Sequence, residues 1–219
     1  AALLPNMETA VSFVMDGRPL IGEQVAAFGQ GVVGLLTTAS LARFPLESLL
    51  TLDAYSLRRQ CSVGFGATQS LDPTAANVIE ELRKCAHVEQ SGDGFDLTYE
   101  LSGNPAALDQ AISATGYDGR VVIGSWYGAK RADLDLGGRF HRGRVKLISS
   151  QVSRLAPELT GLWAKSRRMK FALRMLEELR PASLITHRFS IRQAPEAYDL
   201  LDRMPEEAIQ IIFTYEDMG

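Results

Sequence analysis

Short apolar runs alternate with amphipathic stretches through the middle of the chain. The runs predict strands, and they cover Val25–Phe28, Leu49–Leu52, Phe95–Tyr99, Val121–Ile123 and Val145–Ile148. Between the runs, apolar positions recur at helical spacing over residues 32–44, 56–63, 74–86 and 105–115. Continuous apolar strands separated by helices are typical of a parallel sheet that helices cover on both faces. The pattern therefore predicts an α/β fold built on a doubly wound parallel sheet flanked by helices.

The two ends of the chain follow a different pattern. Residues 1–18 predict a helix that Asp16 and Gly17 close. The later segments are a basic helix at about 164–180, an extended piece to Ser190, a helix at about 193–203 and a strand at 208–215. We therefore expect a C-terminal helix–strand extension beyond the sheet domain.

The helix at 164–180 carries a cluster of basic residues, which are Lys165, Arg167, Arg168, Lys170 and Arg174. Such a cluster indicates either an anion-binding or RNA-binding surface or a solvated helix face. The same helix has apolar side chains for a packing side, at Phe171, Leu173, Met175 and Leu176. We therefore interpret the cluster as a solvated face. The net charge of −3 also argues against nucleic acid as a main partner.

The composition is that of a globular chain. Of its 219 residues, 46% are hydrophobic and 22% charged, which is enough to bury a full core. No apolar stretch reaches the roughly 18 to 20 residues that a membrane span needs, and the opening residues lack the pattern of a signal peptide. Cys61 and Cys85 have no metal-binding spacing, so we expect free thiols and a cytoplasmic location.

A glycine-rich turn lies between the first strand after residue 20 and the helix that follows it. Gly29 would permit the tight turn out of the strand, Gly31 would let a pyrophosphate approach the backbone, and Gly34 would let the helix press against the sheet. The helix start at Val32 and Val33 would aim unpaired N–H groups at the phosphates. In this setting the glycine pattern predicts a dinucleotide site on a Rossmann sheet.

A carboxylate, Asp53, ends the second predicted strand, at about the 20-residue distance from the glycines that dinucleotide folds use. It would accept hydrogen bonds from the adenosine ribose hydroxyls and repel a 2′-phosphate. Arg58 and Arg59 complicate this preference, because Arg58 could stack on adenine or meet a phosphate. We predict NAD as the cofactor, with NADP less favoured.

Two further loops fall at the carboxyl ends of predicted strands, at Glu100–Gly103 and Gly124–Tyr127. They would flank the nicotinamide if the cofactor extends across the sheet, although each could also be an ordinary strand-ending turn. The predicted cofactor-binding residues are Gly29, Gln30, Gly31, Val32, Val33, Gly34, Asp53, Arg58, Leu101, Ser102, Gly124 and Ser125.

The same segments resemble the cofactor-binding portion of the medium-chain dehydrogenases, the group that includes zinc alcohol, sorbitol and threonine dehydrogenases. The resemblance runs in order through nearly the whole chain, at Gly29–Gly34, Asp53 with Arg58, Gly66–Thr68, Phe95–Gly103, Gly119–Gly124, Ile185–Phe189 and Ala194–Tyr198. It implies an oxidoreductase that transfers hydride between a primary or secondary alcohol and NAD. It also implies a homodimer or tetramer joined along the edge strand near Val145–Ile148.

The resemblance has a limit in the catalytic half of the family. There, a preceding domain supplies a cysteine and a Gly-His-Glu motif that bind zinc; in this sequence no cysteine precedes Cys61, and the first histidine is His87. The resemblance therefore implies a helix at 1–18, an NAD-binding domain at 19–180, and a segment at 181–219 that returns to a missing catalytic domain. Zinc would be present only in the intact enzyme.

No catalytic or metal-binding residue is predicted in this chain. Glu8 is the nearest candidate for a further family metal ligand, but it does not align with that ligand, and a helix-surface carboxylate is the favoured interpretation. The three histidines, His87, His141 and His187, are far apart and are interpreted as surface or packing residues. The spacing of Tyr127 and Lys130 is not that of short-chain dehydrogenases.

Two alternatives stay open at this point. One is a catalytically inactive NAD-binding sensor or scaffold, which the missing metal ligands favour. The other is a methyltransferase or flavodoxin-like fold with a glycine-lined turn, and the methyltransferase would bind S-adenosylmethionine in place of NAD.

Overall fold

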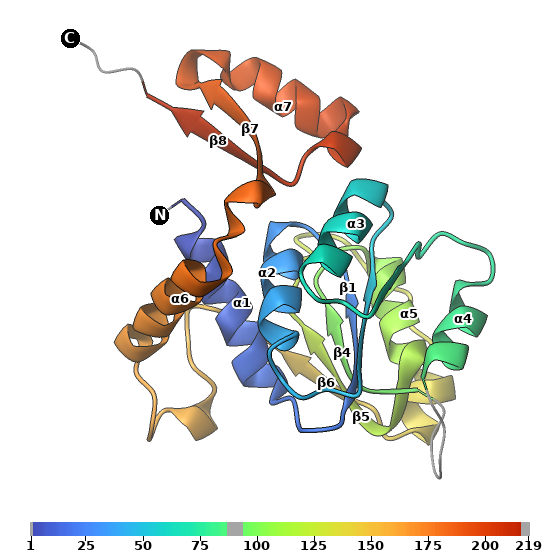
Figure 1. The fold of residues 1–219 in the computed structure, drawn as a ribbon. Helices are drawn as coiled ribbons and strands as arrows, with labels where there is room; N and C mark the ends of the chain where they lie inside the picture. The colour runs from blue at the N-terminus through green and yellow to red at the C-terminus, as the bar shows by residue number, and fades with distance from the viewer. Residues whose placement is uncertain (1, 87–93, 216–219) are drawn as a thin grey trace.

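A single parallel sheet organises most of the molecule (Figure 1). The computed structural model describes residues 2–86 and 94–215. Six strands pair in the order β3-β2-β1-β4-β5-β6, and they are β1 (Gln24–Phe28), β2 (Ser48–Leu52), β3 (Gln69–Leu71), β4 (Phe95–Glu100), β5 (Thr115–Ile123) and β6 (Lys146–Ser149). This is the strand order of a doubly wound Rossmann sheet, so the predicted fold class is confirmed.

Helices cover both faces of the sheet. These helices are α1 (Leu4–Gly17), α2 (Val32–Leu41), α3 (Ser56–Gly64), α4 (Val78–Cys85) and α5 (Pro105–Ala114). Outside this layer, α6 (Lys165–Leu179) packs on α1 and α2, and α7 (Ala194–Arg203) lies in the C-terminal part of the chain. The described residues also form short helical turns, which are η1 (Leu136–Phe140), η2 (Pro157–Leu159), η3 (Pro181–Leu184), η4 (Ile191–Gln193) and η5 (Pro205–Glu207). None of the helices within the described residues is long and apolar enough to cross a membrane.

Alternate residues of each strand point to opposite faces and build two cores. Ala26 and Phe28 of β1 pack towards α4 and α5, whereas Val25 and Ala27 pack on the side of α1, with Phe13. The period-two alternation of a strand explains why every position of the run Val25–Phe28 is apolar, because both faces of β1 are buried. A third cluster joins α1, α2 and α6.

The sequence pattern missed β3. Its three residues are exposed, half-buried and buried in turn, so only Leu71 has the apolar character of a buried strand. The helix predicted at 74–86 also begins later, at Val78. Before it, the Thr74 backbone N–H and hydroxyl both donate to Asp72 Oδ1, at 2.9 and 2.6 Å, and this turn delays the helix.

The C-terminal residues form a small unit that stands beside the carboxyl edge of the main sheet (Figure 1). Its two parallel strands, β7 (Ile185–Ser190) and β8 (Gln210–Thr214), form a sheet of their own, and α7 connects them. The piece predicted only as extended up to Ser190 is therefore a strand. The Asn6 side chain donates to Gln210 Oε1 at 3.2 Å and joins the unit to α1.

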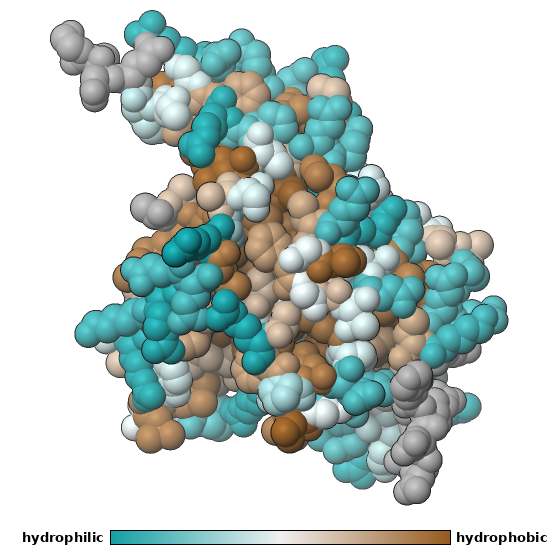
Figure 2. All heavy atoms as spheres, viewed as in Figure 1, coloured by the Kyte–Doolittle hydropathy of each residue, from teal (hydrophilic) through white to brown (hydrophobic). Residues whose placement is uncertain are grey.

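The interpretation of the basic cluster on α6 as a solvated face is wrong for Arg168. Figure 2 shows hydrophilic residues over the outer side of α6, but the Arg168 side chain is only 2% exposed. Its guanidinium donates to Glu8 Oε1 at 2.8 Å and to the Val152 carbonyl at 2.7 Å. Helical spacing places Arg168 among the apolar residues of α6, and its ion pair with Glu8 of α1 offsets the cost of burying its charge.

Other sequence predictions have simple outcomes. Both cysteines are free thiols, and His141 is exposed. His187 is half-buried and stacks on Phe189, and His87 lies outside the described residues. The strand predicted at 145–148 is β6, an edge strand; its use in a dimer or tetramer stays a prediction.

Tyr99 of β4 gives a stability prediction. Its ring is fully buried, its hydroxyl has no hydrogen-bond partner among the described residues, and burial raises the pKa of the phenol. Since a buried unpaired hydroxyl costs free energy, we expect Tyr99→Phe to raise the free energy of unfolding by about 1 kcal/mol, measured in urea. Tyr117→Phe, at an exposed tyrosine of β5, is the control and should change nothing. A clear destabilisation by Tyr99→Phe would show that the hydroxyl has a partner.

Candidate functional site

The turn between β1 and α2 requires glycine at its first position. Gly29 has a φ of +91°, in the left-handed region. A Cβ added there would lie 2.6 Å from the backbone N and Cα of Ser102. The Gly29 N–H donates to the Leu52 carbonyl at 2.8 Å and ties the turn to the end of β2. Backbone conformation and packing therefore both exclude a side chain at Gly29.

The other two glycines of the pattern differ from each other. A Cβ on Gly34 would lie 2.0 Å from the Gly29 carbonyl oxygen, so the helix is pressed against the turn. A Cβ on Gly31 would meet no atom within 4 Å. The backbone of Gly31 is extended, with φ −65° and ψ −178°, and any residue can adopt it. Packing explains Gly34, whereas Gly31 leaves open space in front of α2.

The start of α2 is arranged to receive an anion. Gly31 is the N-cap residue and has no side chain that could cap the helix. The N–H groups of the first turn have no intrahelical acceptor, and the helix dipole places partial positive charge there. Val32 and Val33 are half-buried and pack against the α1 and α6 side of the sheet. Packing therefore occupies their side chains, and their backbone N–H groups belong to the uncapped first turn of α2.

Asp53 follows β2 directly and lies beside the glycine turn. Its side chain is nearly buried, at 7% exposure. Oδ2 accepts from the Gln30 N–H at 2.7 Å, and Oδ1 accepts from the Tyr55 N–H at 2.9 Å. Each carboxylate oxygen can accept a further hydrogen bond, so Asp53 can hold the turn and still receive a hydroxyl.

Gln30 supports the turn from behind. Its side chain is fully buried, accepts from the Thr38 hydroxyl at 2.8 Å, and donates to the Ala27 carbonyl at 3.3 Å. These bonds point the Gln30 amide into the protein. The Gln30 side chain therefore supports the turn and is not placed to contact a ligand directly.

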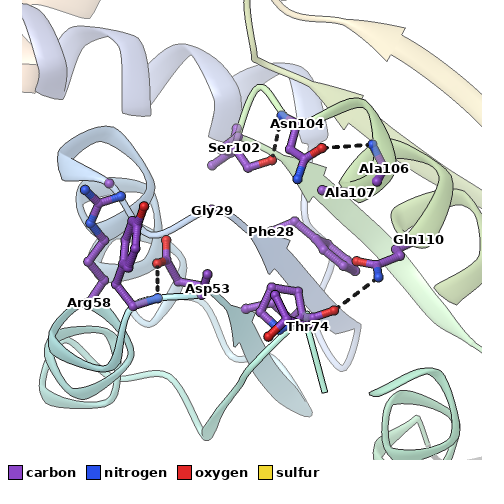
Figure 3. A pocket seen from close by; sticks show the side chains of 16 residues that line it. Phe28, Gly29, Asp53, Arg58, Thr74, Ser102, Asn104, Ala106, Ala107 and Gln110 are labelled. Atoms are coloured by element: carbon purple, nitrogen blue, oxygen red, sulfur yellow. Dashed lines mark hydrogen bonds between the residues drawn. The ribbon is translucent and has the colours of Figure 1, made fainter. Parts of the chain in front are cut away.

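A pocket of about 450 Å³ opens at the carboxyl ends of β1, β2 and β4 (Figure 3). Its lining comes from these strand ends, from α3, from the residues after β3 and from α5: Phe28, Gly29, Gly31, Leu52, Asp53, Ala54, Tyr55, Arg58, Pro73, Thr74, Leu101, Ser102, Asn104, Ala106, Ala107 and Gln110. The order of strands reverses between β1 and β4, and ligands of such sheets bind at that crevice.

Arg58 lines the pocket, but its guanidinium has partners in the protein. Nη2 donates to the carbonyls of Pro205 and Ala208, at 3.1 and 3.0 Å, in the turn before β8. The guanidinium also stacks on the Tyr55 ring, 4.7 Å from its centre. The expected stacking on adenine or contact with a phosphate therefore competes with a link to the C-terminal unit, which a sequence pattern cannot reveal.

Arg59 is engaged as well. Its Nη1 donates to the carbonyls of Asp53 and Ala54, both at 2.7 Å, and lies 3.1 Å from the Asp72 carboxylate. Both arginines beside the end of β2 are thus held by protein acceptors.

The two loops predicted to flank the nicotinamide are in contact with each other. The Ser125 hydroxyl accepts from the Gly103 N–H at 2.8 Å, and the Ser102 hydroxyl donates to Glu100. Leu101 lines the pocket, whereas Gly124 is packed under α1, since a Cβ there would lie 2.5 Å from the Phe13 ring. The two serine hydroxyls stabilise the loops from within.

Several pocket residues were missed by the sequence analysis. Thr74 and Pro73 follow β3, and because no apolar run marks that strand, the sequence predicts no strand-end loop at these residues. Asn104 could have been found, since an Asn-Pro pair before a helix is a capping signal; its side chain accepts from the Ala106 N–H at 3.1 Å. Gln110 donates to the Pro73 carbonyl at 3.2 Å and closes one wall.

The described part of the chain has no cluster of metal-binding side chains. Within residues 2–86 and 94–215 there is no group of three or more histidine, cysteine, aspartate or glutamate side chains that could hold a metal ion. Glu8 is the partner of Arg168 and its side chain is only 17% exposed, so its interpretation as a helix-surface carboxylate needs correction.

Residues 33–167 match the family model described as zinc-binding dehydrogenase. The chain belongs to this family. A sorbitol dehydrogenase from Bacillus subtilis (strain 168) is 28% identical over 123 residues, which are 56% of this chain and 34% of that protein. An L-threonine 3-dehydrogenase from Photorhabdus laumondii is 25% identical over 195 residues, 89% of this chain and 51% of that protein. The match thus spans between about a third and about a half of the length of these relatives.

Solved structures share the fold of this family member. One is described as a short chain alcohol dehydrogenase from Escherichia coli CFT073 complexed with NADH; the TM-score is 0.79 at 15% identity, over 98% of this chain and 58% of that chain. Another, from Sinorhizobium meliloti 1021, is described as a zinc-binding dehydrogenase bound to NADP. It has a TM-score of 0.70 at 20% identity, over 90% of this chain and 54% of that chain.

Proposed function

We propose that this chain is the NAD-binding part of a zinc-type dehydrogenase that transfers hydride between a primary or secondary alcohol and NAD. Family membership and the sorbitol and threonine dehydrogenase relatives support an alcohol or polyol substrate. In this proposal residues 19–180 hold the cofactor, and residues 181–219 pack with the part of the enzyme that the longer relatives have in addition.

The observation that carries the proposal is the open, uncapped start of α2 beside Asp53. The pyrophosphate would lie in the space left by Gly31, where the N–H groups of Val32 and Val33 are free to donate. The adenosine ribose would meet the Asp53 carboxylate. The adenine would enter the pocket, whose lining includes Tyr55 and Thr74.

The nicotinamide end would extend from the glycine turn towards Leu101 and Ser102. When bound, the cofactor supplies a hydride acceptor or donor at the nicotinamide ring. The residues of this chain bind and orient the dinucleotide and exclude water from its adenosine half. We assign no proton transfer to any of them.

The preference for NAD over NADP rests on charge around Asp53. A 2′-phosphate would need a cation in place of the carboxylate, but Arg58 and Arg59 are both bonded to protein acceptors. To meet a phosphate, either arginine would have to give up these bonds. The carboxylate would still repel the phosphate at short range.

This preference is tested by titrating the protein with NADH and NADPH and following nicotinamide fluorescence. We expect NADH to bind at least about tenfold more tightly, and Asp53→Ala to narrow that ratio by about tenfold, the factor that 1.4 kcal/mol gives. Asp96→Ala is the matched control, because the Asp96 carboxylate also accepts a backbone N–H, from Gln24 at 2.8 Å. Asp96 lies near the amino end of β4, at the edge of the sheet opposite the pocket. Tighter NADPH binding, or a ratio that Asp53→Ala leaves unchanged, would contradict the assignment.

A further inference from the structure

Glu100 is a fully buried carboxylate at the end of β4, next to Phe28 of β1 in the sheet. Among the described residues it has no ion-pair partner. Its charge is instead met by hydrogen-bond donors from two loops. Oε1 accepts from the Ser102 N–H at 2.8 Å, from the Ser102 hydroxyl at 2.5 Å and from the Gly103 N–H at 3.2 Å. A buried carboxylate is tolerable only with such a set of donors.

The other oxygen of Glu100 reaches the loop after β5. Oε2 accepts from the Tyr127 hydroxyl. Burial raises the pKa of the Tyr127 phenol, and the hydrogen bond to Glu100 and its charge raise it further, so the phenol remains a donor. The same two loops are joined by Lys130 Nζ, which donates to the Gly103 carbonyl at 3.0 Å. One carboxylate therefore ties together the loops that follow β4 and β5.

The loop after β4 is also the support of the glycine turn. The Leu101 N–H donates to the Phe28 carbonyl at 2.8 Å, and the backbone of Ser102 lies where a Cβ of Gly29 would be. With no side chain between them, a shift of Ser102 must move Gly29 or open a gap behind it. Glu100 thus acts on the glycine turn through Ser102.

We propose that Glu100, with Tyr127 as its second anchor, is a positioning residue that fixes the Ser102–Gly103 turn and through it the cofactor-binding turn at Gly29. The inference rests on the proposed function, since it assumes that a dinucleotide binds there. Glu100 itself does not touch the dinucleotide in this proposal, because its side chain is fully buried and both carboxylate oxygens accept from protein donors.

Three variants test this role. Glu100→Ala removes the acceptor of the Ser102 N–H and leaves the Gly103 N–H with the Ser125 hydroxyl alone, and we expect NADH affinity to fall by about tenfold or more. Glu100→Gln can turn its amide oxygen to these N–H groups and its NH2 to the Tyr127 oxygen. Its NADH affinity should therefore lie within about threefold of that of the unaltered protein. Tyr127→Phe removes one donor and should lower affinity by about threefold to tenfold. Tyr117→Phe, at an exposed tyrosine of β5, is the control.

The second readout is amide hydrogen exchange at Ser102, whose N–H donates to Glu100, in the protein without cofactor. It should accelerate at least about tenfold in Glu100→Ala and much less in Glu100→Gln. If Glu100→Ala fails to fold, Tyr127→Phe carries the test with the same two readouts. Unchanged NADH affinity and unchanged exchange in the folded variants would overturn the inference. Failure of the unaltered protein to bind NADH or NADPH would instead overturn the proposed function.

Discussion

Gly31→Val is expected to abolish cofactor binding while the protein stays folded. The isopropyl group would fill the space in front of α2, where the pyrophosphate is proposed to lie, and NADH affinity should fall at least about hundredfold. The cost in stability should be at most about 1 kcal/mol, because the backbone of Gly31 is extended, no atom lies within 4 Å of the added Cβ, and the remaining penalty is that of a poorer N-cap. Fluorescence titration and thermal unfolding measure the two effects.

The same substitution at Gly34 is the matched comparison, and its main effect should be a loss of stability. The added Cβ would lie 2.0 Å from the Gly29 carbonyl oxygen, and neither backbone can move without disturbing β1. We expect a loss of about 3 kcal/mol in the free energy of unfolding. NADH binding by Gly31→Val with the affinity of the unaltered protein would refute the assignment of the space at Gly31 to the cofactor.

Arg168→Ala should be the most destabilising change at a charged residue. It would leave the partly buried Glu8 carboxylate and the Val152 carbonyl without their donor, and removal of one partner from a buried ion pair costs about 3 to 5 kcal/mol. The loss should appear in urea unfolding followed by circular dichroism. Arg167→Ala is the control: its guanidinium stacks on the Trp163 ring at 4.1 Å on the exposed side of α6, and its loss should cost at most about 1 kcal/mol.

A double variant separates the charge from the packing at this site. Arg168→Met combined with Glu8→Leu removes both charges and keeps apolar bulk, and it should recover the stability to within about 2 kcal/mol of the unaltered protein. If the double variant is as unstable as Arg168→Ala, the helix contact depends on the ion pair itself. If Arg168→Ala has no effect, the pair between α1 and α6 does not form.

Much of the fold was predictable because its causes are local. The strands β1, β2, β4 and β5 contain apolar runs buried on both faces, and each glycine of the turn lies within a few residues of the strand and helix that need it. Asp53 was found because it ends such a run. β3 was missed because its residues grade from exposed to buried, so no short pattern marks it.

The partners of long polar side chains were not predictable, because they come from distant parts of the chain. Arg58 bonds to carbonyls of Pro205 and Ala208, and Arg168 pairs with Glu8; in each pair the residues are far apart in sequence. Glu100 was seen only as part of a strand-ending turn. Its role as an acceptor for two loops depends on Tyr127, which the β4 to β5 register brings beside it.

Hydrogen exchange with and without saturating NADH tests the central claim most directly, that a dinucleotide binds at the glycine turn. The first N–H groups of α2 have no intrahelical acceptor and should exchange rapidly in the free protein. We predict that NADH slows exchange in residues 29–36 above all, and also in 53–58 and 101–104, with no change in α6. NADH binding that leaves residues 29–36 unchanged, or that protects α6 instead, would contradict the account.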